Sequence, residues 1–159
     1  MRNRTLNWLV TILLLWAGSH CGISIAEDVD NYDSEIVLIV HPKNSTSQLS
    51  RREVIEIFMG RYQIFPNGLM ALPVDADETR DVFYRALIQK PLSEVNAYWA
   101  QLVFSGGKSP PQRVNNCTDV LSIVSNNVNS IGYVYKKYLT PEVKPVANLT
   151  TLNDDGRAR

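Results

Sequence analysis

Acidic side chains gather in one short polar turn of the sequence. This turn has the highest density of side chains that could bind a ligand or take part in a reaction. Asp75, Asp77, Glu78 and Asp81 fall within seven residues, between an apolar run and an amphipathic stretch. Four carboxylates could bind a divalent cation, because oxygen ligands suit hard metal ions. Acids at a helix start more often cap the free N–H groups and complement the helix dipole. We therefore predict helix capping at this turn and no metal site.

Groups that usually carry out catalysis are sparse elsewhere in the chain. Beyond the first 26 residues it holds one histidine, His41, and one cysteine, Cys117, far apart in the sequence. The patterns G-x-S-x-G, P-loop and H-E-x-x-H are absent from the sequence. Cys117 has no His or Lys beside it, which indicates a small buried hydrophobe near a helix start. We predict no catalytic residues, no cofactor and no enzyme activity.

The first 26 residues have the three parts of a secretory signal peptide. Arg2 and Arg4 precede an apolar run over residues 6–16, and Ser24-Ile25-Ala26 is a small-x-small cleavage site. This pattern predicts cleavage after Ala26 and a periplasmic location. The apolar run is shorter than the roughly 20 residues that cross a bilayer. An uncleaved N-terminal anchor is the alternative.

The charge balance excludes one class of partner. Without Arg2 and Arg4, the 16 basic residues become 14, against 16 acidic ones. The remaining chain is nearly neutral and has no run of like charges, whereas a nucleic-acid partner requires a basic face. We predict no binding to DNA or other nucleic acids.

Apolar runs alternate with amphipathic stretches over residues 35–149, which predicts an α/β domain with a mixed β-sheet flanked by helices. Five consecutive aliphatic residues, Ile36 to Val40, predict a strand buried on both faces. Further strands are predicted before Asp75, at residues 131–135 and, as an edge strand, at residues 143–147. The polar segment 27–34 is predicted to be a mobile leader and residues 150–159 a disordered tail.

Four helices are predicted between these strands. The first begins at Ser50, where Glu53 completes a capping box, and ends near Gly60. The second follows the acidic turn, and its predicted buried face comprises Val82, Phe83, Ala86 and Leu87.

The third predicted helix opens at Pro91 and the fourth is capped by Thr118, with a long irregular loop at residues 106–116 between them. The third helix carries three aromatic residues that we predict to lie in the core. These are Tyr98, Trp99 and Phe104.

Three segments, in this order, resemble signatures of the phosphate ABC-transporter substrate-binding proteins. Residues 49–61 read Leu-Ser-Arg-Arg-Glu-Val-Ile-Glu-Ile-Phe-Met-Gly-Arg and resemble L-S-x-x-x-x-x-x-I-F-x-G-K/R. Residues 79–83, Thr-Arg-Asp-Val-Phe, are similar to T-R-x-x-F, and residues 131–134, Ile-Gly-Tyr-Val, to A-I-G-Y-V. The resemblance implies a periplasmic-binding-protein fold, in which two α/β lobes hold the ligand between them. This chain is too short for both lobes and resembles one of them.

The resemblance also implies where a ligand would bind. In the family, S-G-T-R opens a helix whose hydroxyls and N–H groups hold the oxyanion, and an arginine stands just upstream. Here Asp77 and Glu78 stand at the Ser and Gly positions, only Thr79 and Arg80 match, and the upstream arginine is missing. A carboxylate beside phosphate is costly in a partly desolvated site. We therefore expect these four residues to form at most a weak oxyanion site.

Two functions remain open from the sequence. The first is an exported solute-binding-like module with weak or lost phosphate binding, which takes a small oxyanion or another small ligand and contacts a membrane transporter or sensor. The second is a protein–protein adaptor or sensor accessory without a small-molecule ligand. Another chain that supplies the missing lobe is compatible with either function.

Overall fold

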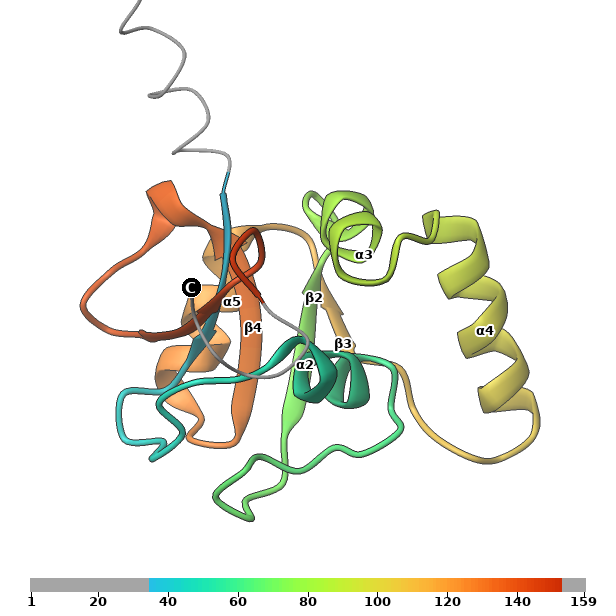
Figure 1. Ribbon diagram of the computed structural model, residues 1–159, viewed down its shortest axis with the longest axis horizontal. Coiled ribbons are helices and arrows are strands. Elements are labelled where there is room, and N and C mark those ends of the chain that lie inside the picture. The colour runs from blue at the N-terminus through green and yellow to red at the C-terminus, as the bar shows by residue number, and fades with distance from the viewer. Residues whose placement is uncertain (1–34, 153–159) are drawn as a thin grey trace, which may run out of the picture.

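The computed structural model describes residues 35–152 and shows a five-stranded mixed sheet with helices on both faces (Figure 1). The sheet has the strand order β3-β2-β4-β1-β5. β2 is parallel to β3 and β4, whereas β1 is antiparallel to β4 and β5. The strands are β1 (Ile36–Val40), β2 (Leu72–Ala76), β3 (Gln112–Val114), β4 (Ser130–Tyr135) and β5 (Lys144–Asn148). The predicted α/β class with a mixed, helix-flanked sheet is confirmed.

The helices divide between the two faces of the sheet. α5 packs with the core cluster on one face, and the other three α-helices contribute to the cluster on the opposite face. Their bounds are α2 (Arg51–Phe58), α3 (Arg80–Ile88), α4 (Leu92–Phe104) and α5 (Cys117–Asn126), and a 3-10 turn, η1, spans Lys136–Tyr138. No helix within residues 35–152 is long and apolar enough to span a membrane.

Strand β1 lies inside the sheet, as its aliphatic sequence predicts. All five of its residues are buried, and their side chains alternate between the two core clusters. Ile36, Leu38 and Val40 face one cluster, whereas Val37 and Ile39 face the other. A strand covered on both faces needs no polar alternation, which explains its uninterrupted aliphatic run.

The first predicted helix is confirmed at both ends. Ser50 is the N-cap of α2 and forms the predicted capping box with Glu53. Gly60 follows the helix with a φ of 67°, the left-handed conformation that glycine adopts at low cost.

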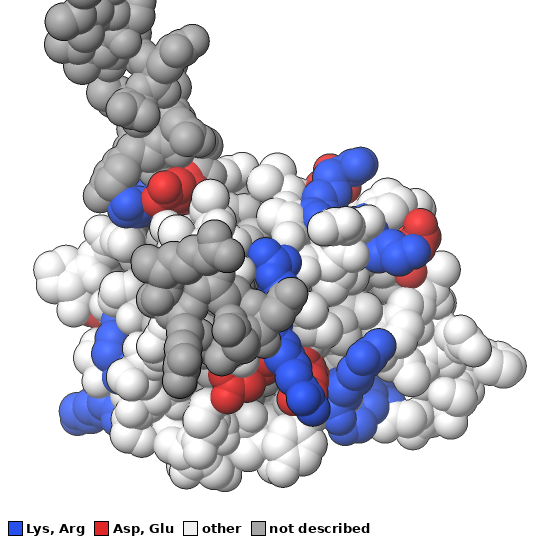
Figure 2. Space-filling model, viewed as in Figure 1, with Lys and Arg blue, Asp and Glu red and all other residues white. Residues whose placement is uncertain are grey.

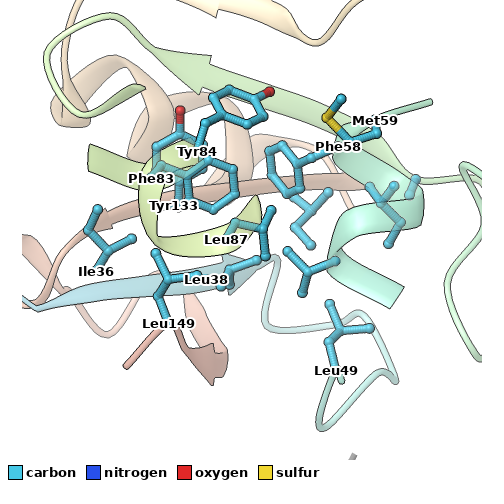
Figure 3. Close-up of a cluster of buried hydrophobic side chains, with 14 of the residues drawn as sticks. Ile36, Leu38, Leu49, Phe58, Met59, Phe83, Tyr84, Leu87, Tyr133 and Leu149 are labelled. Carbon is cyan, nitrogen blue, oxygen red and sulfur yellow. The ribbon is translucent and has the colours of Figure 1, made fainter. Parts of the chain in front are cut away.

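The buried face of α3 differs from the prediction by part of a turn. Phe83 and Leu87 are buried as predicted, but Val82 is 47% exposed and Ala86 is exposed. Tyr84 is buried in their place, and Figure 3 shows its ring beside those of Phe83 and Tyr133. The two faces are adjacent on a helical wheel, and packing against the sheet selects the one that carries both aromatic residues.

Three other local predictions are wrong. Phe104 is 96% exposed, because it is the last residue of α4 and lies beyond the helix's contact with the core. Asn116, not Thr118, caps α5, and its side chain accepts a hydrogen bond from the Asp119 N–H. The predicted irregular loop contains the three-residue strand β3, which is too short to give a periodic signal.

The remaining domain predictions fall largely outside the described residues. The predicted signal peptide (1–26) and leader (27–34) lie wholly outside the described residues, and so do residues 153–159 of the predicted tail. The predicted edge strand at residues 143–147 corresponds to β5, which pairs with β1 at one edge of the sheet.

Candidate functional site

The turn between β2 and α3 carries the four candidate ligand residues. A buried ion pair between Asp75 and Arg80 holds this turn in place. Asp75 lies fully buried in β2, and its Oδ2 accepts a hydrogen bond from the Nε of Arg80 at 2.8 Å. The phenol of Tyr84 donates to the same carboxylate at 3.0 Å, and that of Tyr133 donates to Oδ1 at 3.2 Å. Arg80 also donates from Nη1 to the Oδ1 of Asn96 in α4, at 3.0 Å. This network joins β2, α3, α4 and β4.

Burial and charge act in opposite directions within this network. Burial raises the pKa of the Asp75 carboxyl, against the opposing effects of Arg80 and the two phenols. Burial alone would lower the pKa of Arg80, but the hydrogen bond and charge of Asp75 outweigh it, so that this pKa is raised. Burial and the Asp75 charge hold the pKa values of Tyr84 and Tyr133 well above the ordinary range, so both phenols remain donors. Three donors converging on two oxygens fit an ionised carboxylate.

Asp77 is held by a residue from the neighbouring strand. Its Oδ1 accepts hydrogen bonds from the Nε and Nη2 of Arg113 in β3, at 2.9 and 2.6 Å. Both side chains are about half exposed, so the pair lies at the surface of the turn. A ligand anion would have to compete with Asp77 for this guanidinium.

Glu78 is directed toward the start of α5. Its Oε1 accepts a hydrogen bond from the Cys117 N–H at 3.1 Å. A carboxylate at this place complements the helix dipole. Burial, and then the hydrogen bond to Glu78, raise the pKa of the Cys117 thiol to about 12. Cys117 is thus the buried, unreactive cysteine that the sequence predicts.

Thr79 is the N-cap of α3, but its hydroxyl turns back toward the strand. Thr79 Oγ1 donates to the Ala76 carbonyl at 3.3 Å, and no side chain caps the helix. The predicted side-chain capping of α3 by acids is therefore wrong, although Asp81 lies in the first turn, where an acid complements the helix dipole. Asp81 instead pairs with Arg85 one turn along α3, at 2.7 Å.

The structure thus brings all four candidate residues to one turn and gives each an internal partner. Arg80 pairs with Asp75 on the preceding strand and not with an acid of its own helix. Sequence reasoning placed Asp75 among the capping residues and missed its two tyrosine partners and the role of Arg113. The position of Asp75 inside an otherwise apolar strand was the sequence signal that its carboxylate has a buried partner.

Two hollows lie away from this turn, along α2. One, of about 290 Å³, has an apolar floor shared by α2, the end of α3 and α4, and its rim carries Arg61, Lys90 and Glu94. The other, of about 470 Å³, is lined by Arg51, Arg52, Ile55, Glu56 and Arg61. Figure 2 shows basic and acidic side chains gathered together on this part of the surface. None of the four candidate ligand residues lines either hollow.

Within residues 35–152, no group of three or more His, Cys, Asp or Glu side chains is placed to hold a metal ion. The carboxylates of the acidic turn diverge, because each is directed toward a different element.

The mixed sheet, its helices and the strand–turn–helix at β2–α3 together define a periplasmic-binding-protein-like α/β lobe. Solved structures share this fold. One is from Clostridium perfringens, named as a phosphate ABC transporter substrate-binding protein and solved with bound phosphate, with a TM-score of 0.57 and 22% identity. Another is an ABC-type phosphate transport receptor from Vibrio cholerae, with a TM-score of 0.55 and 13% identity.

The match covers 70% of this chain but only 44% and 45% of those two proteins, so the chain spans less than half their length. At these identities the likeness establishes the fold alone. No family model matches the sequence, and no curated protein matches it.

Proposed function

We propose that this chain is an exported solute-binding-like module, related to phosphate ABC-transporter substrate-binding proteins, in which phosphate binding is weak or lost. Its place of action is the periplasm, where it contacts a membrane transporter or sensor. The fold likeness and the three sequence signatures support the relationship, and the tripartite N-terminus supports export.

The observation that carries the weak-binding part is that all four candidate side chains at the turn are used internally. The two cations nearest the turn are neutralised, Arg80 by Asp75 and Arg113 by Asp77. Glu78 and the hydroxyl of Thr79 are hydrogen-bonded within the lobe. A phosphate would therefore have to break existing hydrogen bonds and lie beside two carboxylates.

Exposure weakens the site further. The Asp77–Arg113 pair is open to solvent, where the high dielectric constant reduces every charge–charge and charge–dipole contact. An oxyanion held on one side only gains little under these conditions. We expect a dissociation constant on the order of millimolar, which corresponds to about 4 kcal/mol.

Calorimetric titration of the purified chain with phosphate, sulfate and divalent cations tests this proposal. The expected result is millimolar or undetectable phosphate binding. If no phosphate binds at the turn, the titration of Thr79→Ala should be the same as that of the unmodified chain. Micromolar phosphate binding by the unmodified chain would refute the proposal, because it would require a clamp that the internal partners exclude.

Export is tested separately, by fractionation and by mass spectrometry of the purified protein. We expect the protein in the periplasmic fraction with Glu27 as its first residue. An intact Met1, or a lipid on Cys21, would contradict the proposed processing.

A protein–protein adaptor is the second candidate function, and the apolar hollow of about 290 Å³ between α2 and α4 favours it. Its apolar lining, with Arg61 and the Lys90–Glu94 ion pair at the rim, suits a protein segment better than phosphate. A photocrosslinking residue at Arg61, on the rim, should capture a specific envelope protein, whereas one at exposed Lys43 should not. Equal capture at both positions would remove the support for an adaptor.

A further inference from the structure

The segment from Arg61 to Leu72 forms a β-hairpin whose outer face is apolar. Ile64 and Met70 form an antiparallel bridge, and the Ala71 N–H donates to the Gln63 carbonyl at 2.9 Å. The turn is closed by Gly68, whose φ is 85° and whose N–H donates to the Phe65 carbonyl at 2.9 Å.

The tip of this hairpin is tied to the body of the domain. The Nδ2 of Asn67 donates to the side chains of Asn44 and Ser45, both at 2.9 Å. The hairpin is therefore held in place by hydrogen bonds at its turn as well as by the start of β2.

The pairing register sorts the hairpin side chains into two faces. Because side chains alternate along a strand, Phe65 and Ala71 share the inner face, and both are buried in the core. The outer face then carries four large apolar side chains, namely the bridged pair and the residues two positions further from the turn on each side. These are Tyr62, Ile64, Met70 and Leu72, which are 58%, 38%, 62% and 42% exposed.

This arrangement departs from the usual pattern of a half-buried hairpin. A strand pair that covers a core on one side normally carries polar residues on the solvent side. Scattered apolar residues at a surface need no explanation, but a contiguous apolar patch marks a contact surface. Half of the large apolar side chains exposed in the described residues fall in this one hairpin, if Leu69 at the tip is included.

The low charge of the hairpin argues against strongly anionic partners. From residue 57 to residue 74 the only charged side chain is Arg61. An anionic lipid surface or an acidic peptide would call for several cations on the patch, and only one is present. A neutral apolar face can instead meet an identical face without like-charge repulsion at its centre.

We propose that the outer face of the 61–72 hairpin is the contact surface between two copies of this chain, related by a two-fold axis. In such an isologous contact the same four side chains cover each other. The surface lies at the start of β2, and the Asp77–Arg80 turn follows the end of that strand, so dimerisation leaves the turn open (Figure 1). Four side chains supply less than the roughly 800 Å² per partner of a stable complex. The dimer is therefore weak and forms in a concentration-dependent manner.

Sedimentation velocity of the purified chain over a range of concentrations tests this proposal. The unmodified chain should shift from monomer to dimer as its concentration rises. Met70→Lys should weaken the association about tenfold or more, because it places two like charges at the contact. Phe104→Lys is the matched control, since Phe104 is fully exposed on α4, and it should leave the association unchanged.

Charge pairing keeps the test specific to this face. Met70→Lys and Met70→Glu should each be monomeric alone but associate when mixed, and circular dichroism should confirm that both are folded. A chain that stays monomeric at every concentration, or a Met70→Lys variant that dimerises like the unmodified chain, would overturn the proposal. Binding of the monomeric chain to phosphatidylcholine–phosphatidylglycerol vesicles, lost in Met70→Lys, would also overturn it by assigning the face to a membrane.

Discussion

At the scale of single residues, Asp75 has the most demanding environment in the described part of the chain. It is fully buried and accepts hydrogen bonds from Arg80, Tyr84 and Tyr133. Removing its carboxylate therefore leaves three buried donors without their acceptor. A buried charge that loses its partner is strongly destabilising. The role of Asp75 is therefore to hold the turn in place from the core and to neutralise Arg80.

Asp75→Ala should lower the free energy of unfolding by about 3–5 kcal/mol, because Arg80 is then left buried and unpaired. Urea denaturation followed by fluorescence measures this change. Asp81→Ala is the matched control, since it breaks an exposed ion pair with Arg85 and should leave the midpoint nearly unchanged. Similar losses for both variants would show that Asp75 is not the centre of the network.

The acids of the turn can be tested as barriers to anion binding. Asp77→Ser frees Arg113, and Glu78→Gly frees the Cys117 N–H, so the double variant should bind phosphate more tightly than the unmodified chain. Phosphate-dependent chemical shifts of the turn amides measure the affinity. A second double variant, Asp77→Ser with Arg113→Ala, should lose part of the gain, and an unchanged affinity in both would contradict the assignment of this turn.

Cys117 gives a further residue-scale prediction. Burial raises the pKa of its thiol from 9.0 to about 12, which lowers the thiolate fraction near pH 8 roughly a thousandfold. Modification by 5,5′-dithiobis(2-nitrobenzoate) should therefore be at least that much slower in the folded protein than in urea. Comparable rates in the two conditions would show that the thiol is accessible.

At the scale of elements, α3 is defined by one aromatic face. The ring of Phe83 stacks on that of Tyr133 with centroids 3.7 Å apart and meets Phe58 edge-on at 4.9 Å (Figure 3). The helix is therefore fastened to β4 and α2 by the same side chain. The neighbouring position, Val82, is exposed and contributes little to this contact.

Phe83→Ala should lower the free energy of unfolding by about 3–5 kcal/mol, the range for truncation of a core aromatic residue. Val82→Ala, one position away on the same helix, should change it by less than about 0.5 kcal/mol. Denaturant unfolding of both variants measures the difference. A loss below about 1 kcal/mol for Phe83→Ala would show that the other face of the helix is buried.

At the scale of the whole molecule, one carboxylate links the start of β1 to the ends of its two neighbours. Glu35 Oε2 accepts hydrogen bonds from the Lys136 Nζ, after β4, and from the Asn148 amide, at the end of β5, both at 2.9 Å. These hydrogen bonds lower the pKa of Glu35, with that of Lys136 contributing most.

A lowered pKa in the folded state stabilises the protein above the ordinary glutamate pKa, and this contribution is lost as the pH falls through the lowered value. Glu35→Gln should therefore be less stable than the unmodified chain at pH 7, and the two should converge at strongly acidic pH. Urea midpoints measured across this range give the comparison. A constant difference at all pH values would show that ionisation of Glu35 is not the cause.

The sequence alone determined much of the fold. The aliphatic run of β1, the capping box of α2 and the order of strands and helices predicted a mixed α/β sheet, because these signals are local. Hydrophobic periodicity depends on neighbouring residues, and so it identifies the elements without knowledge of what packs on them.

Only the tertiary structure decided what the acidic turn does. Asp75 meets Tyr133, Asp77 meets Arg113, and Glu78 meets Cys117, and each of these pairs is separated by at least 36 residues in the sequence. The turn residues have several local partners within reach, and the sheet order determines which distant element lies beside each one. For the same reason the sequence placed the buried face of α3 slightly wrong. Packing against β4 selects between two adjacent apolar faces, and no local pattern encodes that contact.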